Sequence, residues 1–461
     1  MDTVIGRWMA MTLEPRWWNG GKDLQLCRFA DDSDFYGLQD RAAQGAFFTG
    51  RRKMSRERRI SGHEDLHIGI GTALLIMVTL ESALMGSGRM LMVGSLTVKM
   101  WLFIVAQIYV IASIALHRKV GASSVAITLS FSMLSCLGVI VGLLHHSTIE
   151  LILQDIQPAM YVFMLFFVEM TMRDIRNVHR VMTLIKAASI FVSITYFVIV
   201  SLLLAGIINF TSFYNLLSSA TGQEFMFRGI SGMFFYKGFI YIAIGLIYFA
   251  FDPTRKARIA AVITVLALIA TGMRGFFLAL MAVLIVHYMT CGQQSGRKIK
   301  YVVMPVACLS MVLIMFSGSL VGKEDSDYVR ITTAREVMDK ITLPSVLFGN
   351  GFGIGVESKP VHMESSFLEI FHKQGLLGCL WWGAVFALLV ERYRKVRQVN
   401  YSIAQPLFLS VVFLIFESMT NPYLNNPIGM YVLIVAVAGL GVLARSDSLQ
   451  PLLTKTQCAS F

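Results

Sequence analysis

Charged side chains are scarce in this 461-residue sequence, where Asp, Glu, Lys and Arg make up only 15% of the residues. Soluble proteins contain about 25%. Apolar residues make up 56%, and the mean hydropathy is +0.65. A water-soluble protein of this size could not bury that much apolar surface, so the lipid bilayer must act as its solvent. The composition therefore excludes a soluble protein and predicts a chain that crosses the membrane many times.

Cysteine is also scarce, and its placement excludes two further classes of site. The six cysteines lie in or beside apolar stretches or in the two tails: Cys27, Cys136, Cys291, Cys308, Cys379 and Cys458. None falls in a predicted outer loop, so the sequence predicts no disulfide framework. No Cys-x-x-Cys pair or His/Cys cluster is present, and no metal site is expected.

What the sequence does contain is a series of long apolar stretches. A membrane-spanning helix needs about 20 mostly apolar residues. Twelve stretches meet or approach that length: 68–86, 97–116, 122–144, 156–172, 187–207, 232–251, 259–273, 276–291, 301–319, 376–391, 403–419 and 427–444. The predicted fold class is thus an all-α polytopic membrane protein with twelve transmembrane helices in a domain over 67–445.

Basic residues predict how this domain is oriented. Alternate connections at 117–119, 173–186, 255–258, 297–300 and 391–397 together hold 16 Lys and Arg residues. Because basic residues near span ends favour the cytoplasmic side, these loops and both termini are predicted to be cytoplasmic. The net charge of +12 is then a sign of orientation, and no nucleic-acid partner is expected.

The two tails lie outside the predicted spans. Residues 1–66 show no signal-peptide pattern and are predicted to form a poorly ordered cytoplasmic tail. Its basic end, 51–59, is expected to contact anionic membrane lipids. Residues 446–461 are predicted to form a second cytoplasmic tail.

Four arginines depart from this charge pattern because they fall at or beyond the predicted outer face: Arg228, Arg274, Arg330 and Arg335. Arg274 lies between two spans with almost no loop, where burying a guanidinium costs several kcal/mol without compensation. Two interpretations are open. Arg274 reaches lipid headgroups or pairs with Glu81 or Glu417, or the arginines form an anion site, since a guanidinium donates two hydrogen bonds to phosphate oxygens.

The one large outer loop, at 320–375, contains short predicted elements. A helix is predicted at 328–338, with Pro344 ending that run. A glycine-rich turn follows, containing Gly351, Gly353 and Gly355. Because this turn does not join a strand to a helix, it does not indicate nucleotide binding. It predicts backbone with positive φ, or a close approach to a ligand.

The end of the loop is predicted to be a second helix, from about Glu364 to Gly375. Its periodicity places three residues on one apolar face: Phe367, Leu368 and Phe371. Glu369 and His372 are expected to be solvated or at the membrane interface.

Two residues at the start of this helix are candidates for acid–base chemistry. Glu364 or His362 could act as a general base or hydrogen-bond a substrate lying on the membrane. The alternative is that Glu364 only caps the helix.

In order, spacing and topology, these pieces resemble the O-antigen ligase and Wzy-type polysaccharide polymerase superfamily. The matching segments are Arg228-Gly229, 271–275, Arg330, 351–355 and 364–378. Two positions depart from the family pattern. Met273 replaces a serine, and Glu364 stands where ligases carry histidine, with His362 two residues upstream. The second departure is more typical of a polymerase than of a ligase.

The resemblance implies a metal-independent, cofactor-free glycosyltransferase that joins repeat units carried on undecaprenyl diphosphate. Arg228, Arg274, Arg330 and Arg335 would bind the diphosphate, and Arg274 would also act in catalysis by stabilising the leaving group. Glu364 would accept the proton of the acceptor hydroxyl, with His362 as the alternative. The resemblance places the protein in the bacterial inner membrane with its active site facing the periplasm. A chain-length regulator and a flippase of the same pathway are the further partners it implies.

The sequence is also compatible with two other functions. A ligase would move finished polysaccharide to lipid A-core or another acceptor. A transporter of polysaccharide or lipid-linked sugar would need polar groups deep in the spans. The candidates for such groups mostly lie near predicted span ends. They are Asp155, Glu169, Lys237 and Glu417. No internal repeat is visible, which disfavours a transporter of two inverted halves.

Overall fold

The computed structural model describes residues 68–86, 91–93, 96–221, 225–227, 234–290 and 324–458. The chain divides into two units, 1–69 and 70–461, and nearly all the described residues belong to the second. The predicted N-terminal tail, the predicted span 301–319 and Arg228 lie outside the described residues.

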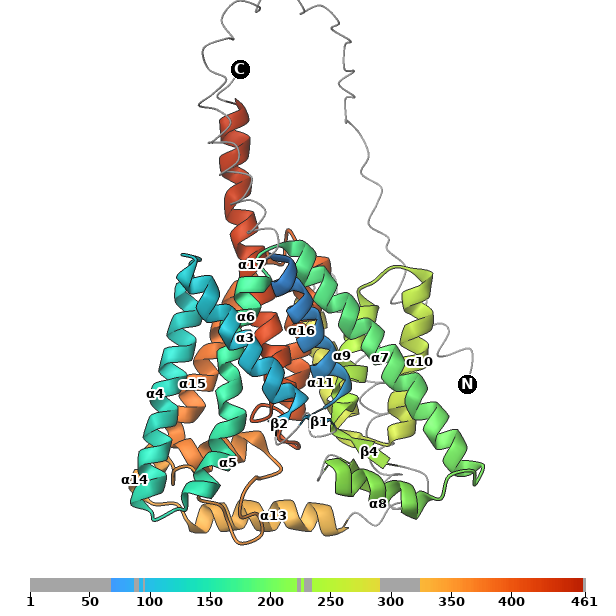
Figure 1. Ribbon diagram of the computed structural model, residues 1–461, viewed down its shortest axis with the longest axis vertical. Helices are drawn as coiled ribbons and strands as arrows, with labels where there is room; N and C mark the ends of the chain where they lie inside the picture. The colour runs from blue at the N-terminus through green and yellow to red at the C-terminus, as the bar shows by residue number, and fades with distance from the viewer. Residues whose placement is uncertain are drawn as a thin grey trace, which may run out of the picture. The chain divides into compact units, whose positions relative to one another are not determined.

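Helices form most of the described chain (Figure 1). A first helix, Ile68–Leu84, precedes those that carry labels. The labelled helices are α3 (Val98–Ala115), α4 (Ala122–Leu144), α5 (Ile149–Ala159), α6 (Met164–Thr171), α7 (Ile175–Leu204), α8 (Phe210–Thr221), α9 (Ile240–Ala250), α10 (Arg255–Thr271), α11 (Arg274–Thr290), α13 (Glu324–Asp339), α14 (Leu343–Phe348), α15 (Ser366–Val396), α16 (Tyr401–Glu417) and α17 (Pro427–Cys458). Short 3-10 helices η1 (Met160–Phe163) and η2 (Lys237–Phe239) precede α6 and α9.

In the described ranges, four short strands form two antiparallel pairs between the helices. Strand β1 (Met92–Val93) pairs with β2 (Leu96–Thr97), which leads directly into α3. Strand β3 (Phe225–Phe227) pairs with β4 (Phe234–Tyr236) ahead of η2, with Phe225 opposite Tyr236.

The prediction of a helical, multi-pass membrane protein is confirmed. Helical segments lie over eleven of the twelve predicted stretches, the exception being 301–319, which is not described. Six helices in the described ranges are long and apolar enough to cross a bilayer, and four apolar helices are shorter. The predicted break between 259–273 and 276–291 is present, because Gly272 ends α10 with a φ of 62°. The count of twelve spans stays a prediction.

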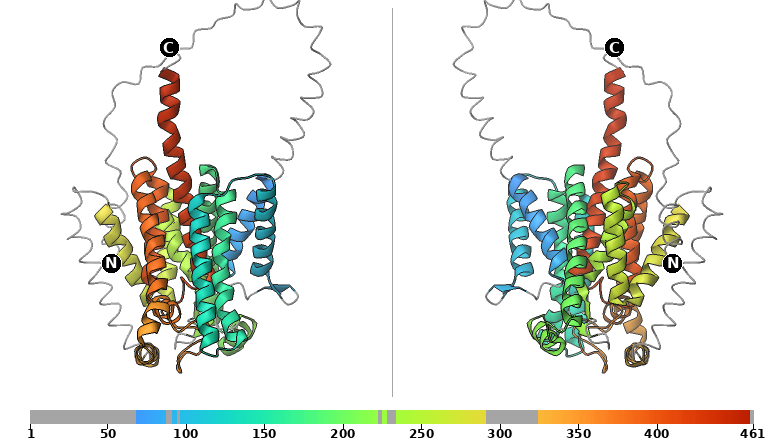
Figure 2. Two further views of the ribbon diagram at one scale, coloured as in Figure 1. Left: turned by 90° about the vertical axis from the view of Figure 1, so that its left-hand side faces the viewer. Right: turned by 90° about the vertical axis from the view of Figure 1, so that its right-hand side faces the viewer.

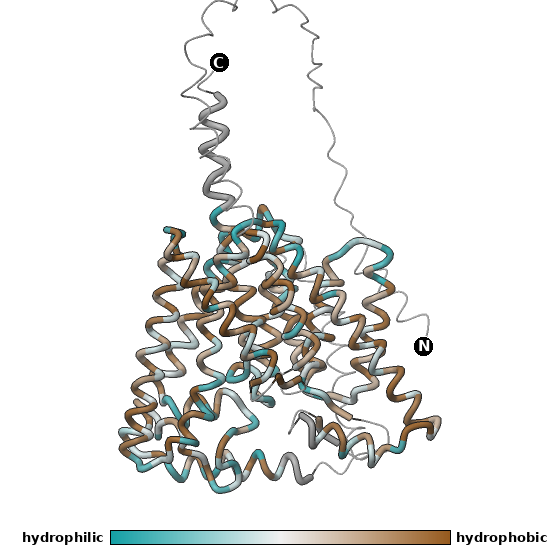
Figure 3. Tube along the Cα trace, in the orientation of Figure 1, coloured by the Kyte–Doolittle hydropathy of each residue, from teal (hydrophilic) through white to brown (hydrophobic). Residues whose placement is uncertain are grey.

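Burial increases from the outer helices to α17. In α17, 83% of the membrane-spanning window is buried, compared with 28% in α3 and in α4. The outer helices expose large apolar side chains instead, such as Ile108 and Ile111, which are 60% and 68% exposed. Figure 3 shows that apolar residues predominate along the bundle helices, while hydrophilic residues gather toward their ends. This is the distribution of a bundle that is surrounded by lipid.

Four of the five basic connections meet at one end of the bundle. Hydrogen bonds and one ion pair join them: Arg173 to the Lys119 carbonyl (2.8 Å), Arg392 to the Ser123 hydroxyl (2.5 Å) and Lys186 to Asp252 (2.7 Å). Helices α13 and α14 lie at the opposite end, where α13 runs across the ends of the bundle helices (Figures 1 and 2). The structure thus separates the basic loops from the large predicted outer loop.

The glycine-rich turn packs on α4. Gly351 and Gly353 have φ values of 88° and 78°, as predicted, whereas Gly355 does not adopt positive φ. The Phe352 amide donates to the Gly138 carbonyl (2.9 Å), and the Phe352 carbonyl contacts Gly142 so closely that a Cβ at residue 142 would overlap it. The close approach made by this turn is therefore to the backbone of α4.

Two predicted helix boundaries in the large loop are wrong. Pro344 does not end a helix but lies in the first turn of α14, where its missing N–H costs nothing. Glu364 does not cap α15, because the N-cap is Ser365, whose hydroxyl accepts from the Leu368 amide. The predicted helix over 328–338 is confirmed by α13, and the predicted break at Gly375 is confirmed by its φ of 63° within α15.

The contact between α4 and the glycine-rich turn predicts an asymmetry between two helical glycines. In Gly142→Ala the new methyl would collide with the Phe352 backbone, which should cost about 1–3 kcal/mol. In Gly383→Ala no atom lies within 4 Å of the new methyl, so stability should stay equal or rise by up to ~1 kcal/mol. Thermal unfolding in detergent, followed by tryptophan fluorescence, compares the two. Equal midpoints would contradict the packing described here.

Candidate functional site

Four of the predicted site residues lie near the loop 418–426, which connects α16 to α17: Arg274, Arg330, His362 and Glu364. Near Thr420 of this loop lies what we call the arginine cluster: Arg274, Arg330, Lys359, Glu364 and Glu417. Arg330, on α13, donates from Nε to Glu364 Oε2 at 2.7 Å and from Nη2 to the Thr420 carbonyl at 3.5 Å. Lys359 Nζ lies 3.4 Å from the second Glu364 oxygen. Both Glu364 oxygens therefore contact cations.

A side-chain clamp holds this part of the large loop on α13. Ser358 donates to Glu336 Oε2 from its amide (2.9 Å) and from its hydroxyl (2.8 Å). These hydrogen bonds hold the pKa of the Glu336 carboxyl below its ordinary value. The Ser358 hydroxyl also lies 2.9 Å from the hydroxyl of Thr333. The segment that carries Lys359 and Glu364 is thereby fixed beside Arg330.

Arg274 is the first residue of α11. The next residue, Gly275, packs so closely that an added Cβ would lie 2.9 Å from a Glu417 oxygen and 3.1 Å from the Thr420 hydroxyl. The Nε and Nη2 atoms of Arg274 are buried and have no hydrogen-bond partner among the described residues. Such donors are costly to leave unsatisfied, so they could accommodate an anion.

The suggested pairing of Arg274 with Glu81 or Glu417 is not seen. Glu81 lies 3.6 Å from Lys99 Nζ, and Glu417 accepts a hydrogen bond from Asn421 at 2.5 Å. Thr420 therefore contacts Arg330 through its carbonyl, and its hydroxyl lies beside Gly275, the residue that follows Arg274.

Arg335 lies apart from this cluster. It is exposed, and it makes no ion pair within the described part of the chain. Five residues beyond Arg330 on a helix correspond to a rotation of about 140°, so the two guanidiniums leave α13 in different directions. The structure does not bring Arg335 to Glu364.

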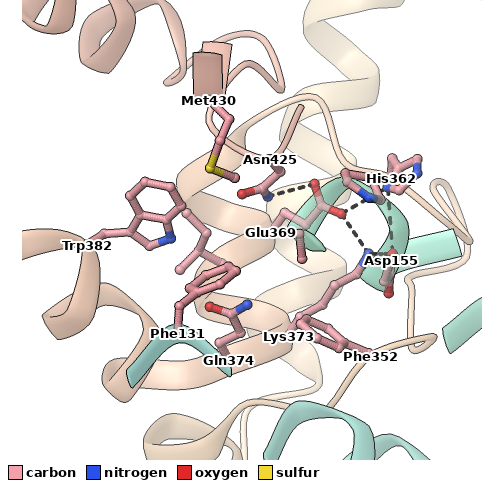
Figure 4. A pocket seen from close by; sticks show the side chains of 13 residues that line it. Phe131, Asp155, Phe352, His362, Glu369, Lys373, Gln374, Trp382, Asn425 and Met430 are labelled. Atoms are coloured by element: carbon pink, nitrogen blue, oxygen red, sulfur yellow. Dashed lines mark hydrogen bonds and ion pairs between the residues drawn. The ribbon is translucent and has the colours of Figure 1, made fainter. Parts of the chain in front are cut away.

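A second polar cluster, which we call the lysine network, lies beside the loop 418–426 (Figure 4). Its centre is Lys373 on α15, whose ammonium donates to Asp155 Oδ1 (2.7 Å), Glu369 Oε1 (2.6 Å) and the Val361 carbonyl (2.6 Å). The Lys373, Asp155 and Glu369 side chains are each only 4% exposed. All three ammonium hydrogens are thus used, as a buried charge requires.

The network fixes other parts of the site. The second Asp155 oxygen accepts from the Gly353 amide at 2.7 Å, which ties the glycine-rich turn to α5. The second Glu369 oxygen accepts from the Asn425 amide at 3.1 Å, which ties the loop 418–426 to α15. His362 Nδ1 lies 3.2 Å from Glu369, while its side chain is 45% exposed. His362 therefore stands at the boundary between the network and the space outside.

The prediction that Glu369 and His372 are solvated or interfacial is wrong, since they are 3% and 2% exposed. Their helix presents polar residues to the protein, while the predicted apolar face is only partly buried. In lipid, a phenylalanine can face outward at little cost, whereas a carboxylate or an ammonium cannot.

The two carboxylates and the imidazole of this network are spaced as the ligands of a metal ion would be. A cation of the protein itself already lies between the carboxylates. One ligand atom from each of Asp155, His362 and Glu369 lies within 4.8 Å of the others. However, the Lys373 ammonium already bridges the two carboxylates. A divalent cation there would be repelled by that charge, so the geometry is that of an ion-pair network.

A cavity of about 580 Å³ adjoins His362 and Glu369. Its walls come from the start of α3, the end of α5, η1 and the loop 418–426, including Met100, Phe103 and Asn425. A much smaller cavity of about 40 Å³ lies beside Lys373 and Glu369, lined by Phe131 and Trp382 among others (Figure 4). The large cavity has the size of a small-molecule or saccharide site.

Sequence reasoning missed Lys373 and Asn425 and gave Asp155 no role in the site. One signal for Lys373 was present, because Glu369 and Lys373 are four residues apart in the predicted loop helix and can pair along it. No local pattern indicated Asp155 or Asn425, which come from segments distant in sequence.

Two lysines of α15 offer a matched test of the network. Lys373 and Lys395 both pair with a glutamate four residues earlier, at 2.6 Å, but the second pair is 64% and 59% exposed. Lys373→Met leaves two buried carboxylates without a cation and should destabilise the fold by about 3–5 kcal/mol. Lys395→Met should cost about 0.5 kcal/mol or less. Unfolding in detergent measures both, and equal losses would refute the network's structural role.

Comparison with known proteins gives the site its family context. No family model matches the chain. The chain is 28% identical over 374 residues to an O-antigen polymerase of Shigella flexneri. The aligned region covers 80% of this chain and 94% of that protein. The aligned length takes in most of the membrane domain rather than one motif. This similarity confirms the resemblance that the motifs indicate, to the Wzy-type polysaccharide polymerase superfamily.

Proposed function

We propose that this protein polymerises a polysaccharide by transferring a saccharide from undecaprenyl diphosphate to another lipid-linked repeat unit. The observation that carries the proposal is the placement of the arginine cluster and His362 around a single loop, 418–426. Arg330 donates to the carbonyl of Thr420, and Asn425 from the same loop donates to Glu369 beside His362. A cationic site and a proton acceptor are what such a transfer needs. The similarity to an O-antigen polymerase supports the same reaction.

The arginine cluster suits the leaving diphosphate. Arg274 has two buried donors without a partner among the described residues, and Arg330 is 40% exposed, so it can reach a substrate. Charge that develops on the departing diphosphate would be stabilised by these fixed guanidinium groups, which can replace the metal used by many sugar transferases. Arg228 is a third candidate by resemblance.

Of the two candidate bases, the geometry favours His362. Its Nδ1 faces the buried Glu369 carboxylate at 3.2 Å, an arrangement that holds the proton on Nδ1 and leaves Nε2 as an acceptor. His362 also lines the large cavity. Glu364 is occupied by Arg330 and Lys359, so we assign it to positioning Arg330.

The reaction then proceeds by a balanced exchange. The acceptor hydroxyl gives its proton to His362 Nε2, and its oxygen attacks the anomeric carbon of the donor sugar. The bond from that carbon to the diphosphate oxygen breaks, and the diphosphate leaves with the electron pair. The products are a longer lipid-linked saccharide and undecaprenyl diphosphate.

We place this reaction at the periplasmic face of the bacterial inner membrane. The basic connections gather at the end of the bundle away from α13, and basic loops favour the cytoplasm. The site, beside α13, would then face the periplasm with both termini in the cytoplasm. A flippase would supply the substrate there, and a chain-length regulator would act on the product.

Loss of the arginines should stop elongation. Arg330→Ala and Arg274→Ala should each reduce long polymer by about 10²–10³-fold, because each removes charge stabilisation of the leaving group. Gel ladders of cell-surface polysaccharide measure this, with membrane levels of the protein determined in parallel. The control is Arg394→Ala, an exposed arginine near the end of α15. Normal ladders in both site variants would overturn the proposal, and polymer retained on its lipid carrier would indicate a ligase instead.

The choice of base makes a separate prediction. His362→Ala should slow elongation by about 10²–10⁴-fold, the usual contribution of a general base. Glu364→Gln should keep part of the activity, because the amide can still accept a hydrogen bond from Arg330. Turnover of the purified variants in lipid nanodiscs distinguishes the two roles, and the reverse ranking would make Glu364 the base.

A further inference from the structure

The reaction needs two lipid-linked molecules, and the arginine cluster accounts for only one of them. We infer that the cavity of about 580 Å³ beside His362 binds the second, the acceptor, as an anionic lipid whose saccharide end reaches His362. This inference rests on the proposed function and assigns its acceptor site. Three properties of the cavity support it: its apolar side, its polar end and the cations in its wall.

The apolar side of the cavity meets the lipid-facing surface of the bundle. Met100, Phe103 and Ile104 of α3 line it, together with Met160 of η1. Ile104 is 39% exposed and Met160 is 44% exposed, so both also belong to the outer surface of the described bundle. A polyprenyl chain could therefore leave the cavity between α3 and η1 and remain in contact with apolar atoms.

The opposite end of the cavity is polar and suited to sugar hydroxyls. It includes His362 and Glu369, and the amides of Gln154, Gln157 and Asn425. Amide groups both donate and accept hydrogen bonds, as a saccharide requires. Because His362 stands at this end, the hydroxyl to be activated would be brought to the proposed base.

The wall also carries cations. Lys99 and Lys237 line the cavity, and Lys99 is held in place by a hydrogen bond to the Gly86 carbonyl at 2.5 Å. The Glu369 carboxylate in the same wall is already neutralised by Lys373. Lys99 is also paired with Glu81 at 3.6 Å, but Glu81 is not part of the cavity wall. The charged groups that the wall itself presents are therefore mainly ammonium groups, which attract an anionic headgroup such as a diphosphate.

The loop 418–426 contacts both this cavity and the arginine cluster, through different residues. Thr420 faces the cluster, where Arg330 donates to its carbonyl, whereas Pro422, Asn425 and Asn426 line the cavity. Arg274, Arg330 and Glu364 are not part of the cavity wall. Two lipid-linked substrates would thus contact different parts of one loop, with the acceptor at the part that adjoins His362.

A matched pair of substitutions on α3 tests the assignment. Met100→Trp fills the cavity, whereas Ile108→Trp adds the same side chain at a position that is 60% exposed on the same helix. The full-length protein in nanodiscs is given two separate probes. One is a repeat unit on undecaprenyl diphosphate with its acceptor hydroxyl blocked, which can only donate. The other is a repeat unit on a non-transferable phosphonate analogue, which can only accept.

We expect Met100→Trp to raise KM for the acceptor probe about tenfold or more and to leave KM for the donor probe within about twofold. Ile108→Trp should change neither. An acceptor probe with a photoreactive group on its lipid chain should crosslink to α3 or η1 in the wild type and in Ile108→Trp but not in Met100→Trp. If Met100→Trp fails to fold, Gln157→Leu replaces it as a smaller change in the cavity wall, and it should also raise the acceptor KM.

Other outcomes separate this inference from the function on which it rests. An unchanged acceptor KM in Met100→Trp, or crosslinks that map to the arginine cluster, would overturn the acceptor cavity and leave the polymerase function standing. If the wild type elongates nothing but still crosslinks at α3, and Met100→Trp abolishes the crosslink, the cavity is an anionic-lipid site and the polymerase function is wrong.

Discussion

The Lys373 ammonium, held between two buried carboxylates and a backbone carbonyl, is the interaction on which the arrangement of the site depends. A charge at this depth requires every hydrogen-bond donor to be used, and its partners come from separate segments. Asp155 connects α5 to the glycine-rich turn, and Glu369 connects α15 to Asn425 and to His362. One buried cation thereby fixes the position of the proposed base relative to the loop 418–426.

That loop relates the lysine network to the arginine cluster. Ser366 at the start of α15 donates from its amide to the Ser418 carbonyl (3.0 Å), and its hydroxyl accepts from the Leu424 amide (3.2 Å). Tyr423 donates to the Lys237 carbonyl at 3.1 Å, next to the cavity. Because the backbone is fixed at several points, the diphosphate and acceptor sites that we propose would keep a constant relation, as transfer between two bound substrates requires.

The sequence predicted the parts of this molecule that lipid dictates. Apolar length located the helices, and the charged Arg274 and the glycine Gly375 located two breaks, because these effects act within one segment. Burial in the large loop could not be predicted in the same way. A helix containing Phe367, Leu368 and Phe371 suggests an apolar inner face. The partners that bury Glu369 and Lys373, however, come from distant parts of the sequence: α5, more than 200 residues earlier, and the loop 418–426, which follows α15 and α16. The resemblance indicated Arg330 and Glu364, but their direct pairing depends on the tertiary fold.

The proposed polymerase activity is tested most directly by giving the purified protein, in lipid nanodiscs, one defined oligosaccharide repeat on undecaprenyl diphosphate. It predicts a ladder of lipid-linked products that differ by one repeat, with one undecaprenyl diphosphate released for each new glycosidic bond and no nucleotide sugar required. A substrate that remains a single repeat, or that crosses the bilayer without being elongated, would contradict it.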